Sequence, residues 1–168
     1  MTIRPLPLFA AGLFALLLAG CNPNYNWRDY ASPDAPYRVM FPAKPASFTR
    51  EIDLDGMRVA MTMTAAEVDG ATFAVGTGVA PDAARAQAAL AAMRTALARN
   101  IGAGTAASPD AGSGADIDVR GMRKDMPVRL VGHFATQGTR FYQVVVIGPV
   151  DGVPAEQLEQ FFTSFSPR

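Results

Sequence analysis

The sequence has very few residues of the kinds that build reactive sites: its 168 residues include one cysteine, Cys21, and one histidine, His133. A single cysteine excludes a disulfide within the chain. Zinc sites and catalytic triads need several histidine, cysteine or carboxylate groups that converge, and this chain has no second histidine or cysteine to contribute. We therefore expect no cofactor, no metal and no enzymatic activity.

An excess of charge of either sign is also absent, because 15 lysines and arginines balance 15 aspartates and glutamates. Nucleic-acid-binding domains normally carry a clear basic excess. The balance predicts that nucleic acid is not a partner.

Long apolar runs are absent with one exception, Leu6 to Ala19, which follows Arg4 and ends in small residues. This composition is typical of a secretory signal peptide. The run is shorter than the about 20 residues that a membrane-spanning helix needs. It therefore predicts a cleaved signal over residues 1–20.

The run ends in Leu18-Ala19-Gly20-Cys21, which resembles the lipobox of bacterial lipoproteins. In that family the chain is cut between the positions of Gly20 and Cys21, and the cysteine then carries acyl chains such as palmitate. The resemblance implies a membrane anchor at Cys21. Because an aspartate after the cysteine often retains a lipoprotein in the inner membrane, Asn22 favours the inner leaflet of the outer membrane. A plain secretory signal with a chance cysteine, or an uncleaved anchor, is the alternative.

Residues 21–36 are rich in asparagine, aspartate and proline and show no periodicity, which predicts a lipidated tether. Three aromatic residues, Tyr25, Trp27 and Tyr30, interrupt this composition. Their rings either pack on the folded domain or lie at the lipid headgroups, where amphipathic rings are favoured.

Residues 37–168 show the pattern of a single domain with strands and two helices. The dipeptides Asp55-Gly56 and Asp69-Gly70 predict tight hairpin turns. Alternation predicts strands over residues 37–41, 47–54, 57–64, 73–79, 116–120, 128–135 and 140–147. The last of these is apolar on both faces, so we expect both faces of an antiparallel sheet to be covered.

The first predicted helix begins after Asp82 as its cap and runs to about Ile101. The second begins at Pro154 and carries the apolar stripe Leu158, Phe161, Phe162 and Phe165. Between the first helix and the next strand, residues 102–114 predict a loop. The fold class is therefore α+β, an antiparallel sheet flanked by helices on both faces.

Three segments are similar to PsbP-like and DcrB-like domains: the strand Tyr37-Arg38-Val39-Met40-Phe41-Pro42, the strand start Gly138 to Tyr142, and Phe161-Phe162-Thr163-Ser164-Phe165. The resemblance implies an α/β/α sandwich in a family of extracytoplasmic, often lipidated proteins that mostly bind or assist assembly. It carries no binding residues over to this chain.

The densest basic stretch contains Arg120, Arg123, Lys124 and Arg129. Such a stretch is either a solvated rim or a contact for anionic headgroups or an acidic partner. His133 shares a strand face with Arg129 and Val131, which favours a structural role.

Three other patterns have ordinary structural interpretations. Glu51, Asp53 and Asp55 are typical of the solvent face of a strand, although they imitate a carboxylate cluster. Met57, Met61 and Met63 predict a core face, with Cu(I) binding as the alternative. Residues 112–118 resemble one calcium-binding turn, but that architecture needs stacked copies.

The sequence therefore predicts a membrane-anchored envelope lipoprotein that faces the periplasm and has a non-catalytic binding or assembly role, with an envelope protein as possible partner. The alternative is a periplasmic protein that binds a small ligand or metal, for which a pocket between the sheet and the first helix would be evidence. An enzyme is the third class, and it would require a cleft that gathers carboxylates.

Overall fold

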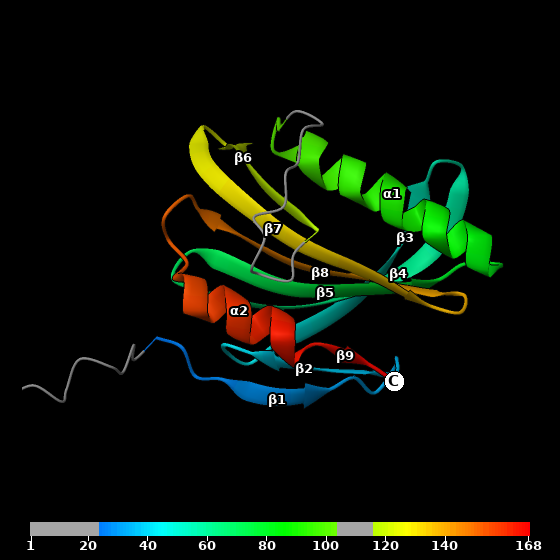
Figure 1. The fold of residues 1–168 in the computed structure, drawn as a ribbon, viewed down its shortest axis with the longest axis horizontal. Helices are drawn as coiled ribbons and strands as arrows, with labels where there is room; N and C mark the ends of the chain where they lie inside the picture. The colour runs from blue at the N-terminus through cyan, green and yellow to red at the C-terminus, as the bar shows by residue number, and fades with distance from the viewer. Residues whose placement is uncertain (1–23, 104–115) are drawn as a thin grey trace, which may run out of the picture.

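The computed structural model describes residues 24–103 and 116–168 (Figure 1). The predicted signal peptide, Cys21, Asn22 and most of the predicted loop over 102–114 lie outside the described residues. Every strand pair in the described part is antiparallel, and the predicted α+β class is confirmed. The elements are β1 (Arg28–Ala31), β2 (Tyr37–Phe41), β3 (Ala46–Leu54), β4 (Met57–Val68), β5 (Ala71–Val79), α1 (Ala83–Asn100), β6 (Ile117–Arg123), β7 (Met126–Gln137), β8 (Arg140–Pro149), α2 (Ala155–Ser164) and β9 (Ser166–Pro167).

The large sheet has six strands in the order β3-β4-β5-β8-β7-β6. The two Asp-Gly turns connect β3 to β4 and β4 to β5, and Asp55, Gly56, Asp69 and Gly70 all have positive φ. Positive φ at both central residues is the geometry of the type I′ turn, which matches the twist of the flanking strands. Both hairpin predictions are confirmed.

Helix α1 packs on one face of this sheet through an apolar cluster. It begins as predicted, since the Asp82 side chain accepts a hydrogen bond from the backbone N–H of Arg85 at 2.8 Å. The predicted core face of β4 is confirmed for three residues of this cluster, Met57, Val59 and Met61, which are buried together with Ala86, Ala89 and Met93 of α1.

A second apolar cluster contains other residues of the large sheet together with residues of α2 and of a separate three-stranded sheet in the order β1-β2-β9. The Phe161 ring of α2 lies at its centre, with centroid distances of 5.7 Å to Phe41 of β2 and 5.2 Å to Phe73 of β5. The prediction of one sheet was wrong in this respect, because β2 pairs with β1 and β9 and not with the large sheet.

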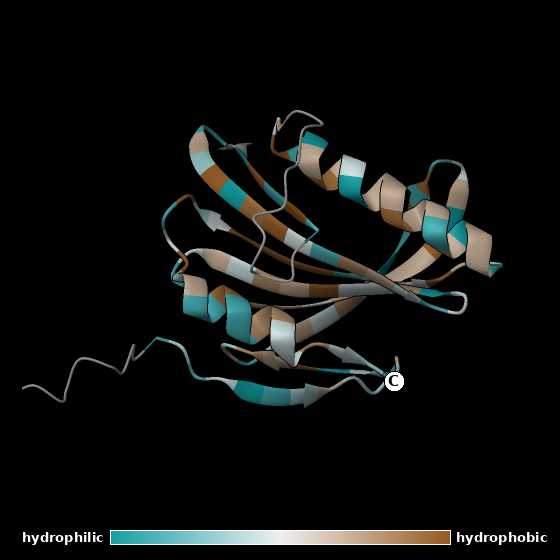
Figure 2. Cartoon of the chain, viewed as in Figure 1, coloured by the Kyte–Doolittle hydropathy of each residue, from teal (hydrophilic) through white to brown (hydrophobic). Residues whose placement is uncertain are grey.

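Residues 24–36 belong to the folded domain, which differs from the predicted tether over 21–36 and the predicted domain start at residue 37. Strand β1 pairs with β2, and Trp27 Nε1 donates a hydrogen bond to Gln157 Oε1 of α2 at 3.0 Å. Tyr25, Trp27 and Tyr30 are partly buried against the α2-side cluster, so their packing on the domain is confirmed. β1 itself is mostly hydrophilic, which explains its tether-like composition (Figure 2).

The end of α1 meets β6 in a close backbone contact. The Met122 N–H donates a hydrogen bond to the Ile101 carbonyl oxygen at 2.7 Å. A Cβ atom placed on Gly121 would lie 2.0 Å from the same oxygen, so only glycine fits there without movement.

Gly121→Ala is therefore expected to lower the free energy of unfolding by about 1–3 kcal/mol, the usual effect of inserting an atom into a packed contact. Urea unfolding would measure it. Arg120→Ala, at the exposed neighbouring position, is the control and should leave the midpoint nearly unchanged. Equal midpoints for both variants would show that α1 can move away from β6 at little cost.

Candidate functional site

The structure divides the predicted basic stretch between the two faces of the β6–β7 hairpin. Arg120 and Arg129 are directly opposite each other in the register of the pair. Arg129 donates from Nε to Asp118 Oδ1 at 2.8 Å and from Nη2 to Asp118 Oδ2. Like charges opposite each other on two strands repel. The bidentate ion pair between Arg129 and Asp118 offsets this repulsion. Arg129 is three-quarters buried and has a structural role. This differs from both predicted alternatives, a solvated rim and a contact for anionic headgroups or an acidic partner.

Arg123 and Lys124 lie elsewhere, at the tip of the hairpin. Arg123 shares a strand face with Ile117 and Val119, which belong to the α1-side cluster, whereas Arg120 is on the opposite face. Lys124 and Asp125 form the connecting turn with φ values of 49° and 63°. The two cations therefore occur together at one end of the large sheet, separated from Arg120 and Arg129.

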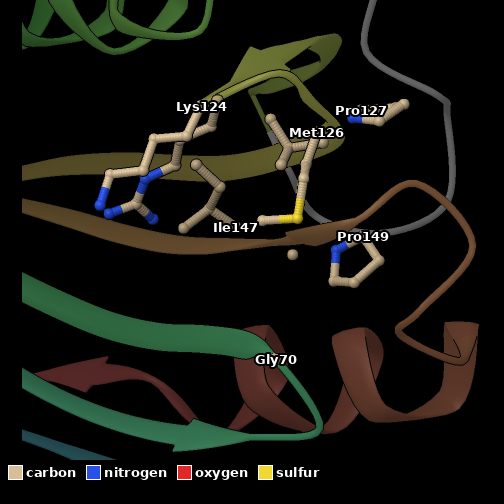
Figure 3. A pocket seen from close by; sticks show the side chains of 9 residues that line it. Gly70, Lys124, Met126, Pro127, Ile147 and Pro149 are labelled. Atoms are coloured by element: carbon tan, nitrogen blue, oxygen red, sulfur yellow. The ribbon is translucent and has the colours of Figure 1, made fainter.

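A pocket of about 420 Å³ opens beside these cations (Figure 3). Three segments that are distant in sequence meet there: the β6–β7 hairpin, the β4–β5 turn and the end of β8. The lining residues are Gly70, Arg123, Lys124, Met126, Pro127, Val128, Ile147, Gly148 and Pro149. No acidic side chain is among them, so the pocket can accept an apolar group that has an anionic end.

Two of the exposed large apolar side chains of the described residues also lie at this hairpin. Met122 is 53% exposed and Met126 is 63% exposed. Met126 is paired with Arg123 and Met122 with Pro127, so the two methionines are on opposite faces of the hairpin. We define the hairpin tip as residues 122–126. The local signal for this surface is the segment Met122-Arg123-Lys124-Asp125-Met126, in which two methionines flank the cations. The prediction from the sequence rested on the charges alone.

Comparison with protein-family models, curated proteins and solved structures finds no match for this chain. Within residues 24–103 and 116–168, neither helix has the length and apolar character needed to cross a membrane.

His133 is not part of the pocket. Its Nδ1 lies 3.3 Å from Asp116 Oδ2, but the two atoms do not form a hydrogen bond. The same Asp116 oxygen accepts a hydrogen bond from the backbone N–H of Phe134. Its ring lies 6.4 Å from the ring of Phe165. In the described part of the chain, no three histidine, cysteine or carboxylate side chains gather as a metal site would require. The imidazole therefore packs at the end of α2, and Asp116 is its carboxylate neighbour within the described residues.

The remaining predicted patterns fall into structural positions. Glu51, Asp53 and Asp55 are exposed, as predicted for a solvent face. Asp53 also accepts the Gly56 N–H at 2.6 Å and so supports the β3–β4 turn. Met63, the third methionine of the possible copper site, lies at the edge of the core and accepts a 3.5 Å contact from the buried Gln143 amide.

The pocket that would have supported a small-ligand protein was expected between the sheet and α1. We call the pocket of about 420 Å³ beside Arg123 and Lys124 the basic pocket, and no residue of α1 lines it. A second hollow of about 390 Å³ does contact α1, but it lies on the exposed side of the helix beside Asp55, and most of its lining residues are alanines. Ligand sites usually combine apolar walls with a few convergent polar groups. Of these two hollows in the described part of the chain, the basic pocket has that character.

Proposed function

We propose that this protein is a bacterial envelope lipoprotein, anchored through Cys21, whose domain faces the periplasm and acts by binding or assembly and not by catalysis. The observation that carries the proposal is the lipobox-like Leu18-Ala19-Gly20-Cys21 directly before a folded domain. The domain begins by Asn24, so the proposed cleavage between Gly20 and Cys21 would remove the signal peptide and leave the domain intact. Asn22 supports the outer membrane as its location.

We also propose that the domain is a PsbP-like α/β/α sandwich. Two observations support this finer assignment. Helices α1 and α2 belong to separate apolar clusters and lie on opposite sides of the large sheet (Figure 1). The segments that carry the resemblance are core elements, since Tyr37, Phe41 and Phe161 are buried. The three-stranded sheet beside α2 is an addition that the resemblance does not explain.

The membrane assignment is tested by separating inner and outer membranes of cells that express the full chain on a density gradient. We expect the protein in the outer-membrane fraction, and recovery in the soluble periplasmic fraction would contradict the anchor. Proximity labelling from the native lipoprotein would then identify the envelope partner. Labelling that matches a non-interacting lipoprotein of similar abundance would contradict the assembly role.

A second candidate function is the binding of a small anionic amphiphile, and the basic pocket favours it. Its volume of about 420 Å³ lies within the range of ligand sites. Its walls are apolar and its charged lining residues are both cations. This candidate is compatible with the membrane anchor, because an anionic lipid such as phosphatidylglycerol is itself an anionic amphiphile.

A further inference from the structure

The first described residues of the chain are fixed at the same end of the domain as the basic pocket. Asn24 Nδ2 donates to both carboxylate oxygens of Asp69, at 2.9 and 3.1 Å. Asp69 and Gly70 form the β4–β5 turn, and Gly70 lines the pocket. A Cβ on Gly70 would lie 3.9 Å from Cγ of Pro149, another residue that lines the pocket, so the turn directly adjoins the pocket. Figure 1 shows the start of the described chain, this turn and the β6–β7 hairpin at the left of the molecule.

This position limits the distance between the domain and a lipid on Cys21. Cys21 precedes Asn24 by three residues, and an extended chain spans at most about 3.6 Å per residue. The lipidated residue therefore lies within roughly 11 Å of Asn24. An acylated Cys21 must hold the β4–β5 turn, and the pocket beside it, close to the membrane surface.

The hairpin tip has the side chains that bind such a surface. Arg123 and Lys124 are exposed cations, and Met122 and Met126 are exposed apolar side chains on the two faces of the same tip. Basic residues bind anionic lipid headgroups, and adjacent apolar side chains enter the boundary between headgroups and acyl chains. Asp125 contributes one opposing charge in the turn but does not line the pocket.

We propose that the hairpin tip is a second membrane contact, which orients the domain on an anionic bilayer. Arg123 and Lys124 pair with headgroup phosphates while Met122 and Met126 enter the interface. The inference rests on the proposed lipidation of Cys21. A tip with two cations binds weakly by itself, but the covalent anchor makes its binding intramolecular and raises its effective concentration. The contact therefore determines orientation, and the acyl chains supply the attachment.

The experiment uses the full acylated chain, with acylation verified by mass spectrometry, inserted into vesicles of phosphatidylcholine alone or of phosphatidylcholine with phosphatidylglycerol. Hydrogen exchange of the amides in residues 122–126 is the readout. We expect slower exchange on the anionic vesicles, because each cation near the surface favours the bound orientation roughly fivefold. The double variant Arg123→Gln/Lys124→Gln should lose this protection, and Met122→Ser/Met126→Ser should weaken it on the same vesicles.

The matched control is Arg50→Gln/Arg58→Gln, which removes the same charge from exposed positions on the β3–β4 hairpin. The turn of that hairpin is at the opposite end of β4 from Asp69, so protection of the hairpin tip should be unchanged. If the chain is acylated but residues 122–126 exchange equally fast on both kinds of vesicle, the docking proposal is overturned and the lipoprotein assignment is not. The absence of any acyl mass would overturn the lipoprotein assignment and the orientation argument with it. Protection in native envelopes but on neither vesicle would assign the tip to an acidic protein partner and overturn the membrane contact.

Discussion

Replacing Phe161 with alanine is expected to lower the free energy of unfolding by about 3–5 kcal/mol, the usual cost of truncating a buried phenylalanine. The side chain is fully buried and joins three layers of the fold. Its ring contacts Phe41 in the small sheet, Phe73 in the large sheet and Phe162 in its own helix. The cavity would be bounded by several elements, so no single side chain can move to fill it. Chemical denaturation of the chain from Asn24 onward would measure the loss.

Two other phenylalanines make this test specific. Phe48→Ala removes a ring that is 53% exposed and should change stability by no more than about 0.5 kcal/mol. Phe165 ends α2 and is only partly buried, with its ring 5.5 Å from that of Tyr142. Phe165→Ala should lower the free energy of unfolding by an amount between those of the Phe161 and Phe48 variants. Equal denaturation midpoints for the Phe161 and Phe48 variants would mean that α2 does not hold the two sheets together.

Replacing Cys21 with alanine is expected to abolish acylation and lipoprotein-type cleavage, because the thiol is the only attachment point for the lipid in the proposed chemistry. Cys21 is the one cysteine of the chain, so no other residue can substitute for it. Metabolic labelling with an acyl probe, followed by separation of membranes from soluble proteins, would measure both effects.

The control for this variant is Asn24→Ala, which removes the hydrogen bonds to Asp69 but keeps the thiol. It should be labelled as strongly as the natural chain. Equal labelling of the Cys21→Ala variant would contradict the lipoprotein assignment, whatever the position of the protein in the cell.

Elements with strong local signals were predictable from the sequence. The Asp82 cap, the two Asp-Gly turns and the alternating methionines of β4 are short-range patterns, and the structure confirms each of them. Strands β1 and β9 have no such signal. β1 is hydrophilic and β9 has two residues, so both exist only through pairing with β2. Pairing between distant segments leaves no periodicity in a single sequence.

The candidate site shows a similar division. Arg123 and Lys124 were identifiable from the sequence as members of a basic stretch, together with Arg120 and Arg129. Strand alternation and the Lys124-Asp125 turn separate these residues, and Asp118 neutralises Arg129. The other side of the pocket comes from Gly70 and Pro149, which approach the hairpin only when the sheet is assembled. That approach depends on tertiary structure and has no local signature.

The small sheet also constrains the order in which this chain can complete its fold. β2 takes β1 as one neighbour and β9 as the other, and the Arg168 N–H donates to the Pro36 carbonyl at 2.7 Å. β1 and β9, which are far apart in the sequence, must therefore both reach β2 before the small sheet closes, whereas the β3–β4–β5 hairpins form from local contacts. Such nonlocal closure is slow. Until α2 and β9 are in place, Phe41 lacks its contact with Phe161 and Tyr37 lacks its contact with Phe165. A chain with an incomplete small sheet therefore exposes apolar surface, which favours aggregation.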